Sequence, residues 1–225
     1  MAPRYGEPVK THGGVTGTTV LTVLSIALTA CGGSDSKVSI DKLQKAADAA
    51  VAAPANPCPL GFDVNAALKK AKVAGTATPA KGTDSGAKAV DADSATSASA
   101  DSAFKQFGGA MITCTYSLSG GGSLEATVTG VQHPKAINLL APLLQRDGHI
   151  ASSDLTTVIT QKLTAGKAVL TPGGGLAAID KLDASGGDAI LEVTTTADDP
   201  QTHHGPLVGE PLRELTETLG KQVRV

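Results

Sequence analysis

The feature of this sequence that most constrains its fold is a pair of alternating segments separated by a glycine-rich link. In residues 110–118 apolar side chains occupy every second position, and the same alternation returns in residues 124–129. The link, residues 119–123, reads Ser-Gly-Gly-Gly-Ser. A period of two on both sides of a glycine link predicts a β-hairpin, with Cys114 on its apolar face.

Apolar spacings of three and four predict helices elsewhere in the chain. We expect helices over residues 40–53, with Ser39 as N-cap, and over residues 64–72, with Asp63 as N-cap. A third helix is expected over residues 134–148, opened by Pro134 and kinked or broken at Pro142. A fourth should run from a cap at Ser153 to Gly166, and a fifth over residues 208–220. Residues 176–182 and 189–196 read as strands around a turn at 184–188, and residues 167–171 form a short apolar segment. Since every link between strands reads as a hairpin, we expect an α+β fold, an antiparallel sheet of about four to five strands with helices mainly on one face.

Residues 74–102 differ in composition from the rest of the chain. They consist almost entirely of Ala, Ser, Thr, Asp, Gly and Lys, and Val90 is their only larger apolar residue. Such a segment buries too little apolar surface to offset the entropy lost on ordering. We therefore expect a disordered insertion within one domain, with a substrate-covering lid or a glycosylated segment as the alternatives.

The first thirty residues have the order of a secretory signal peptide. Arg4 and Lys10 precede an apolar run over residues 15–28. At about 14 residues this run is too short to span roughly 30 Å of hydrocarbon as a helix. A basic start, an apolar run and small residues predict cleavage after residue 30.

The residues at that cleavage point are Leu28-Thr29-Ala30-Cys31. They closely resemble the lipobox of bacterial lipoproteins. The resemblance implies a diacylglyceryl group, with acyl chains such as palmitate, on the Cys31 sulfur. Two acyl chains give durable membrane attachment. It places the protein on the outer face of the cytoplasmic membrane, with residues 31–37 as a lipidated tether and residues 38–225 as a single domain. The alternative is an ordinary signal peptide followed by an accidental cysteine.

Charge and aromatic content limit the partners of the mature chain. The full chain of 225 residues has a formal net charge of −2. Removing residues 1–30 takes out Arg4, Lys10 and Glu7, which leaves 17 basic and 20 acidic residues, a net charge of −3. This balance argues against a nucleic-acid partner. Tryptophan is absent and other aromatics are scarce, which disfavours sites that stack bases or sugars.

If Cys31 carries lipid, Cys58 and Cys114 are the two cysteines left in the chain. Outside the cytoplasm such a pair usually forms a disulfide, and closing a loop of about 57 residues would stabilise the fold by roughly 4 kcal/mol in the chain-entropy model. Two free buried thiols are the alternative. A metal site built on two cysteines lacks neighbouring ligands.

A second resemblance covers most of residues 31–225. It rests on the turn Pro57-Cys58-Pro59-Leu60 after the first helix and on the strand segment Cys114-Thr115-Tyr116, together with the glycine-rich hairpin and the C-terminal helix. This pattern resembles a domain-of-unknown-function group among the small cell-envelope lipoproteins of actinobacteria. The resemblance implies an envelope location and a disulfide, and it supplies no reaction and no catalytic residues.

The sequence contains no nucleophile elbow, no zinc-protease helix and no dinucleotide fingerprint, so we assign no catalytic residue and no cofactor. The densest group of possible metal ligands is Asp198, Asp199, His203 and His204, which also reads as a solvated loop. We expect a non-enzymatic binding or scaffolding lipoprotein with an unknown envelope ligand or protein as partner. The alternatives are an envelope hydrolase or metal-dependent enzyme with an unrecognised site, and a solute-capture lipoprotein for transport.

Overall fold

The computed structural model describes residues 38–53, 58–80, 87–90, 103–133, 135–196 and 207–225. Its helices are α1 (Ile40–Ala52), α2 (Val64–Lys70), α3 (Ala103–Gln106), α4 (Ile137–Asp147), α5 (Ser152–Thr160) and α6 (Glu210–Gly220). Its strands are β1 (Val38–Ser39), β2 (Ala77–Pro79), β3 (Ala87–Val90), β4 (Gly109–Leu118), β5 (Ser123–Val131), β6 (Val169–Leu170), β7 (Ala177–Leu182), β8 (Ala184–Ser185) and β9 (Asp188–Thr196). In these ranges no helix is both long and apolar enough to cross a bilayer.

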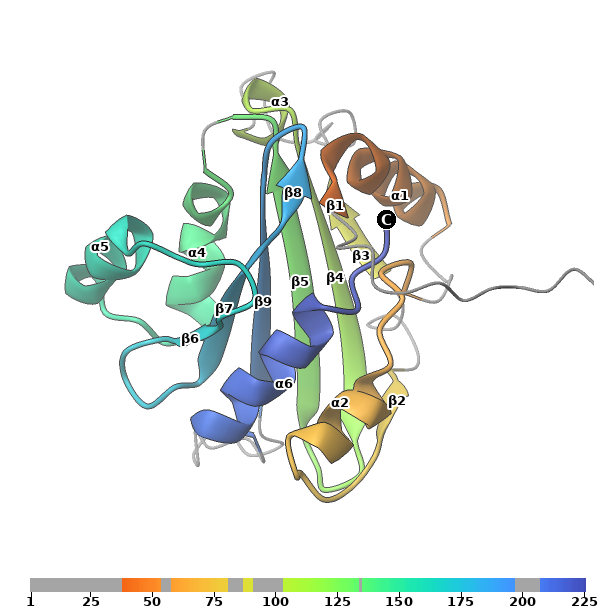
Figure 1. Ribbon diagram of the computed structural model, residues 1–225, viewed down its shortest axis with the longest axis vertical. Coiled ribbons are helices and arrows are strands. Elements are labelled where there is room, and N and C mark those ends of the chain that lie inside the picture. The colour runs from red at the N-terminus through yellow and green to blue at the C-terminus, as the bar shows by residue number, and fades with distance from the viewer. Residues whose placement is uncertain (1–37, 54–57, 81–86, 91–102, 134, 197–206) are drawn as a thin grey trace, which may run out of the picture. The chain divides into compact units, whose positions relative to one another are not determined.

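A seven-stranded antiparallel sheet forms the centre of the fold (Figure 1). Its strands follow the order β2-β4-β5-β9-β7-β6, and β3 also pairs with β4. The predicted hairpin is confirmed as β4 and β5, whose register sets Cys114 opposite Ala126. Separately, β1 and β8 form a parallel pair of two residues each. β8 lies within residues 184–188, which we expected to be a turn. The predicted α+β class is confirmed, and the sheet has more strands than the four to five expected.

The predicted disordered insertion is wrong for two of its segments. β2 and β3 both pair with β4, with Ala77 opposite Leu118 and Ala87 opposite Cys114. The composition argument failed because strand pairing is made by backbone N–H and C=O groups, which small residues supply as well as large ones. Residues 81–86 and 91–102 lie outside the described residues.

Helix starts were predicted better than helix ends. Ser39 caps α1 by accepting from the Lys42 N–H at 3.4 Å, and Asp63 caps α2 by accepting from the Ala66 N–H at 2.9 Å. The cap expected at Ser153 is wrong, since α5 starts at Ser152 after the extended residue Ala151 and without a side-chain cap.

Two further expectations concerned α4 and α5. α5 ends at Thr160 and does not reach Gly166, because Gln161 already has an extended backbone. α4 runs through Pro142 without a break. Pro134, expected to open this helix, lies outside the described residues, and α4 starts at Ile137.

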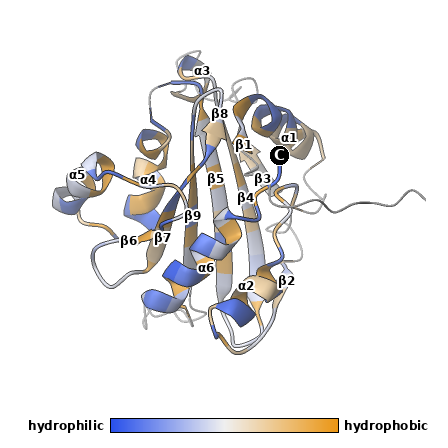
Figure 2. Cartoon of the chain, viewed as in Figure 1, coloured by the Kyte–Doolittle hydropathy of each residue, from blue (hydrophilic) through white to orange (hydrophobic). Residues whose placement is uncertain are grey.

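Helices pack on both faces of the sheet. The larger core joins residues of α1, α2 and α6 to alternate residues of β4, β5, β7 and β9, among them Leu43, Leu68, Ile112, Leu191 and Leu215. In Figure 2 the visible side of α6 is coloured mainly hydrophilic, while its leucines are buried. A smaller core joins α4 and α5 to Val131, Ile179 and Ile190 on the opposite face. This second face carries the site described next.

A cation-lined cleft as candidate functional site

A cleft of about 670 Å³ lies among the described residues on this second face. It lies where β5 ends, α4 begins, α5 ends and β9 begins. Its polar lining includes Gln132, His133, Lys135, Gln161, Lys162 and Lys181, and it also includes the carboxylate of Asp188. We call this feature the cationic cleft. A volume of this size falls in the range that small-molecule sites occupy.

Positive charge dominates the cationic cleft. Its described lining residues include three lysines, Lys135, Lys162 and Lys181, and one carboxylate, Asp188, which gives them a formal charge of +2 with histidine counted as neutral. The chain as a whole is formally −2. The cleft is therefore a local concentration of positive charge on a weakly acidic protein, and such clefts raise the local concentration of anions.

Asp188, the carboxylate among the described lining residues of the cationic cleft, already has two partners. Oδ1 of Asp188 lies 3.2 Å from the Lys181 Nζ, and Oδ2 accepts a hydrogen bond of 2.9 Å from the backbone N–H of Ala136, the residue before α4. Asp188 thus ties the start of α4 to β9 and holds Lys181 at the cleft wall. Its charge is offset by an ammonium group and by a donor at the helix start, where negative charge is favourable.

A glycine makes this arrangement of Asp188 possible. Gly187 comes immediately before it, and a Cβ at Gly187 would lie 1.9 Å from the carbonyl oxygen of Val131. No side chain fits into that space. The close approach lets β9 begin level with the end of β5, where Val131 pairs with Asp188. The chain after β5 then turns directly into the cleft wall.

The floor of the cationic cleft is apolar. Ile137 on α4 and Ile190 on β9 are 3% and 1% exposed. Ile159 and Leu163, at the end of α5 and just after it, are partly buried against the same small core. This floor is packed from α4, α5 and the sheet together. The lysines above this floor are therefore held by packed helices and strands.

Two buried carboxylates lie outside the cleft lining. Glu192 on β9 is 2% exposed, and burial raises its pKa to about 8, with the Asp147 charge adding to the rise and the Arg146 charge opposing it. Asp180 on β7 is 1% exposed, and burial raises its pKa to about 7, with the Glu217 charge adding to the rise. Neither has every oxygen satisfied, since Glu192 Oε1 and Asp180 Oδ1 find no hydrogen-bond partner among the described residues.

The two buried carboxylates sit on opposite faces of the sheet. Glu192 has the same facing as Ile190, which packs against α4 and α5. Asp180 faces α6, where a Cβ at Gly220 would lie 2.4 Å from its Oδ2. They do not form an acid–base pair. The fold brings Glu217 near enough for its charge to raise the pKa of Asp180.

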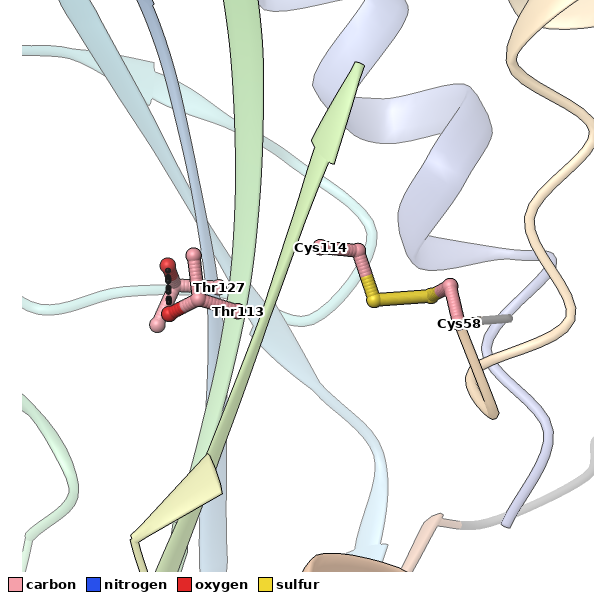
Figure 3. Close-up of a disulfide and its surroundings, with 4 residues drawn as sticks. All are labelled: Cys58, Thr113, Cys114 and Thr127. Atoms are coloured by element: carbon pink, nitrogen blue, oxygen red, sulfur yellow. Dashed lines mark hydrogen bonds between the residues drawn. A yellow bond between two sulfur atoms is a disulfide. The ribbon is translucent and has the colours of Figure 1, made fainter. Parts of the chain in front are cut away.

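The predicted disulfide is confirmed. Cys58 and Cys114 are bonded, with their Cα atoms 5.6 Å apart. Figure 3 shows the bond on one side of β4, with the hydroxyls of Thr113 and Thr127 hydrogen-bonded on the other side at 2.9 Å. The bond ties the turn before α2 to the larger core. It is a structural link remote from the cleft, since neither cysteine lines it.

The other site residues predicted from sequence lie outside the described residues. They are the lipidation site Cys31 and the possible metal ligands Asp198, Asp199, His203 and His204. Within the part of the chain that the structure describes, no group of three or more His, Cys, Asp or Glu side chains is arranged to hold a metal ion.

Sequence reasoning missed the cationic cleft. It gave no binding role to His133, Lys135, Lys162 or Lys181. These lysines come from three separate segments, so no local spacing connects them. Only the pairing of β7 with β9 and the packing of α4 and α5 bring them to one hollow. Comparison with protein-family models, with curated proteins and with solved structures finds no match to this chain.

Proposed function

We propose that the protein is a lipid-anchored, extracytoplasmic binding protein whose cationic cleft holds a small anionic ligand without transforming it. The observation that carries the proposal is that three lysines face one carboxylate, Asp188, among the described residues that line the cleft. An unmatched set of cations in a hollow of this size favours an anion, because Lys135 and Lys162 have no acidic partner among the described residues.

Binding without chemistry is supported by the groups that line the cleft. Lysine ammonium groups only donate hydrogen bonds, and the Asp188 carboxylate is engaged by Lys181 and Ala136. The two carboxylates with raised pKa, Glu192 and Asp180, are buried elsewhere. Among its described lining residues the cleft offers charge complementarity, and its imidazole, His133, has no free carboxylate to pair with, since Asp188 is already engaged.

The envelope location is supported by two features of the chain. The Cys31 segment resembles a lipobox, and a disulfide joins Cys58 to Cys114. Disulfides persist mainly in oxidising compartments. Replacing Cys31 with Ser should move the protein from the membrane fraction to the soluble fraction of lysed cells. Undiminished membrane retention of C31S would contradict the anchor.

The binding function is tested by adding simple anions to the full chain carrying C31S. Acetate, sulfate and inorganic phosphate are titrated while amide NMR shifts are recorded. We expect at least one of them to shift the amides of Ala136 and Ile190, and the shift to disappear in the double variant K135Q/K162Q. The matched control K69Q/K70Q removes two exposed lysines of α2 and should bind normally. Titrations that leave the cleft amides unmoved would refute the proposal.

A further inference from the structure

The anion can be identified further from the kind of cations that the cleft presents. All three are lysines, and no arginine is among the described residues that line it. The planar fork of arginine binds a carboxylate or a phosphate through two parallel hydrogen bonds. Lysine is a compact point charge with three donors and binds phosphate without needing that planar match. The lysines therefore suit a tetrahedral oxyanion, and the charge of the cleft separates a phosphate from a single carboxylate.

The net charge of the cleft also limits which anion it can bind. Lys135, Lys162 and Lys181 against Asp188 leave a formal charge of +2. A phosphate monoester carries about −1.5 to −2 charges at pH 7, since its second pKa is about 6. A carboxylate or a sulfate ester carries one negative charge and would leave the cleft positive. The dianion is thus the better electrostatic match.

The dimensions of the cleft call for more than a bare phosphate. Its volume of about 670 Å³ leaves room beside the anion. The remaining polar lining consists of the Gln132 and Gln161 amides and His133, which suit hydroxyl groups, above the nearly closed floor at Ile137 and Ile190. The room and its lining fit the polar organic part of a phosphate ester.

We infer that the cationic cleft binds a phosphate monoester head, the anion lying against Lys135, Lys162 and Lys181 and its polar alcohol part against Gln132 and Gln161. This inference rests on the proposed binding function. The same phosphate group could come from a soluble molecule or from a lipid. A soluble ester such as glycerol 3-phosphate and the headgroup of phosphatidic acid present the same phosphate. Asp188, which already binds Lys181 and the Ala136 N–H, holds Lys181 in the wall of the cleft.

The test uses the full chain carrying C31S and two arms. In one arm, glycerol 3-phosphate, glycerol and acetate are titrated by calorimetry. In the other arm, the protein is co-sedimented with phosphatidylcholine vesicles with and without phosphatidic acid. We expect glycerol 3-phosphate, the phosphatidic acid vesicles or both to bind. K135Q/K162Q should weaken that binding about tenfold or more, and K69Q/K70Q should not. Binding of the titrated ester alone identifies a soluble source, and binding of the vesicles alone identifies a lipid source.

Two results would overturn the inference. If acetate binds as tightly as glycerol 3-phosphate and K135Q/K162Q abolishes both, the cleft binds anions without preferring phosphate, and only the proposed binding function survives. If no anion or vesicle responds to K135Q/K162Q while the thermal melting of that variant matches the parent, the cleft is not an anion site. That second result would remove the inference and the proposed function together.

Discussion

Replacing Glu192 with Gln tests the electrostatics of the second sheet face. Glu192 is 2% exposed, and its Oε1 has no hydrogen-bond partner among the described residues. Burial, with the Asp147 charge adding to it, raises the pKa of Glu192 from an ordinary 4.5 to about 8. Glutamine has nearly the same shape and never ionises. E192Q therefore removes the charge without opening a cavity.

The sign of the effect follows from proton linkage. The pKa of Glu192 in the folded protein, about 8, lies above the ordinary value of 4.5, so the folded state binds this proton more tightly. The stability from that proton is fully present below pH 4.5 and is lost progressively as the pH rises to 8. At about 1.4 kcal/mol per pH unit, wild type loses about 3 kcal/mol between pH 4.5 and pH 7, and E192Q is spared this loss.

Urea unfolding at a series of pH values measures the difference. We expect wild type and E192Q to have similar unfolding free energies at pH 4.5, and E192Q to be more stable by about 3 kcal/mol at pH 7. Asp180 contributes to the pH dependence of the unfolding free energy in both proteins, so its effect cancels in the comparison. D41N, which removes an exposed carboxylate on α1, serves as the control. Parallel curves for wild type and E192Q would refute the assignment of a buried, proton-bearing Glu192.

Two more predictions concern the larger core. Replacing both Cys58 and Cys114 with Ser, which opens a link across 56 residues, should lower the unfolding free energy by about 2–4 kcal/mol in urea, and an unchanged midpoint would contradict a stabilising crosslink. Gly130→Ala should lower stability by about 1–3 kcal/mol in thermal or urea melts, because the new Cβ would lie 2.6 Å from Leu43 Cδ2 in a packed core. Combining G130A with L43V should recover part of the loss, and a G130A protein as stable as wild type would show that the core yields easily.

The elements that sequence reasoning found are those whose signal is local. Alternation along residues 110–129 defined the β4–β5 hairpin, and the polar caps Ser39 and Asp63 marked two helix starts. β2 and β3 were missed because their pairing depends on the free edge of β4, not on their own side chains. The end of α5 was misjudged because Gly166 suggested a stop six residues beyond Thr160, where the helix ends.

The candidate site was less accessible to sequence reasoning than the fold. Cys58 and Cys114 were paired correctly because elimination left two cysteines for one bond. Lys135, Lys162 and Lys181 share no motif, and their grouping is a product of tertiary packing. The sequence instead drew attention to Asp198, Asp199, His203 and His204, because possible metal ligands lie close together along the chain there. Density along the chain and convergence in space are different properties.

The Cys58–Cys114 bond also determines what a single proteolytic cut can do to this protein. A cut anywhere between these two cysteines would yield two polypeptides that remain one covalent molecule. Such a nicked protein would migrate as intact on a gel without reductant and would separate into fragments only after thiol treatment. A cut after β3 and before β4 would leave β2 and β3 on one product and their pairing partner β4 on the other.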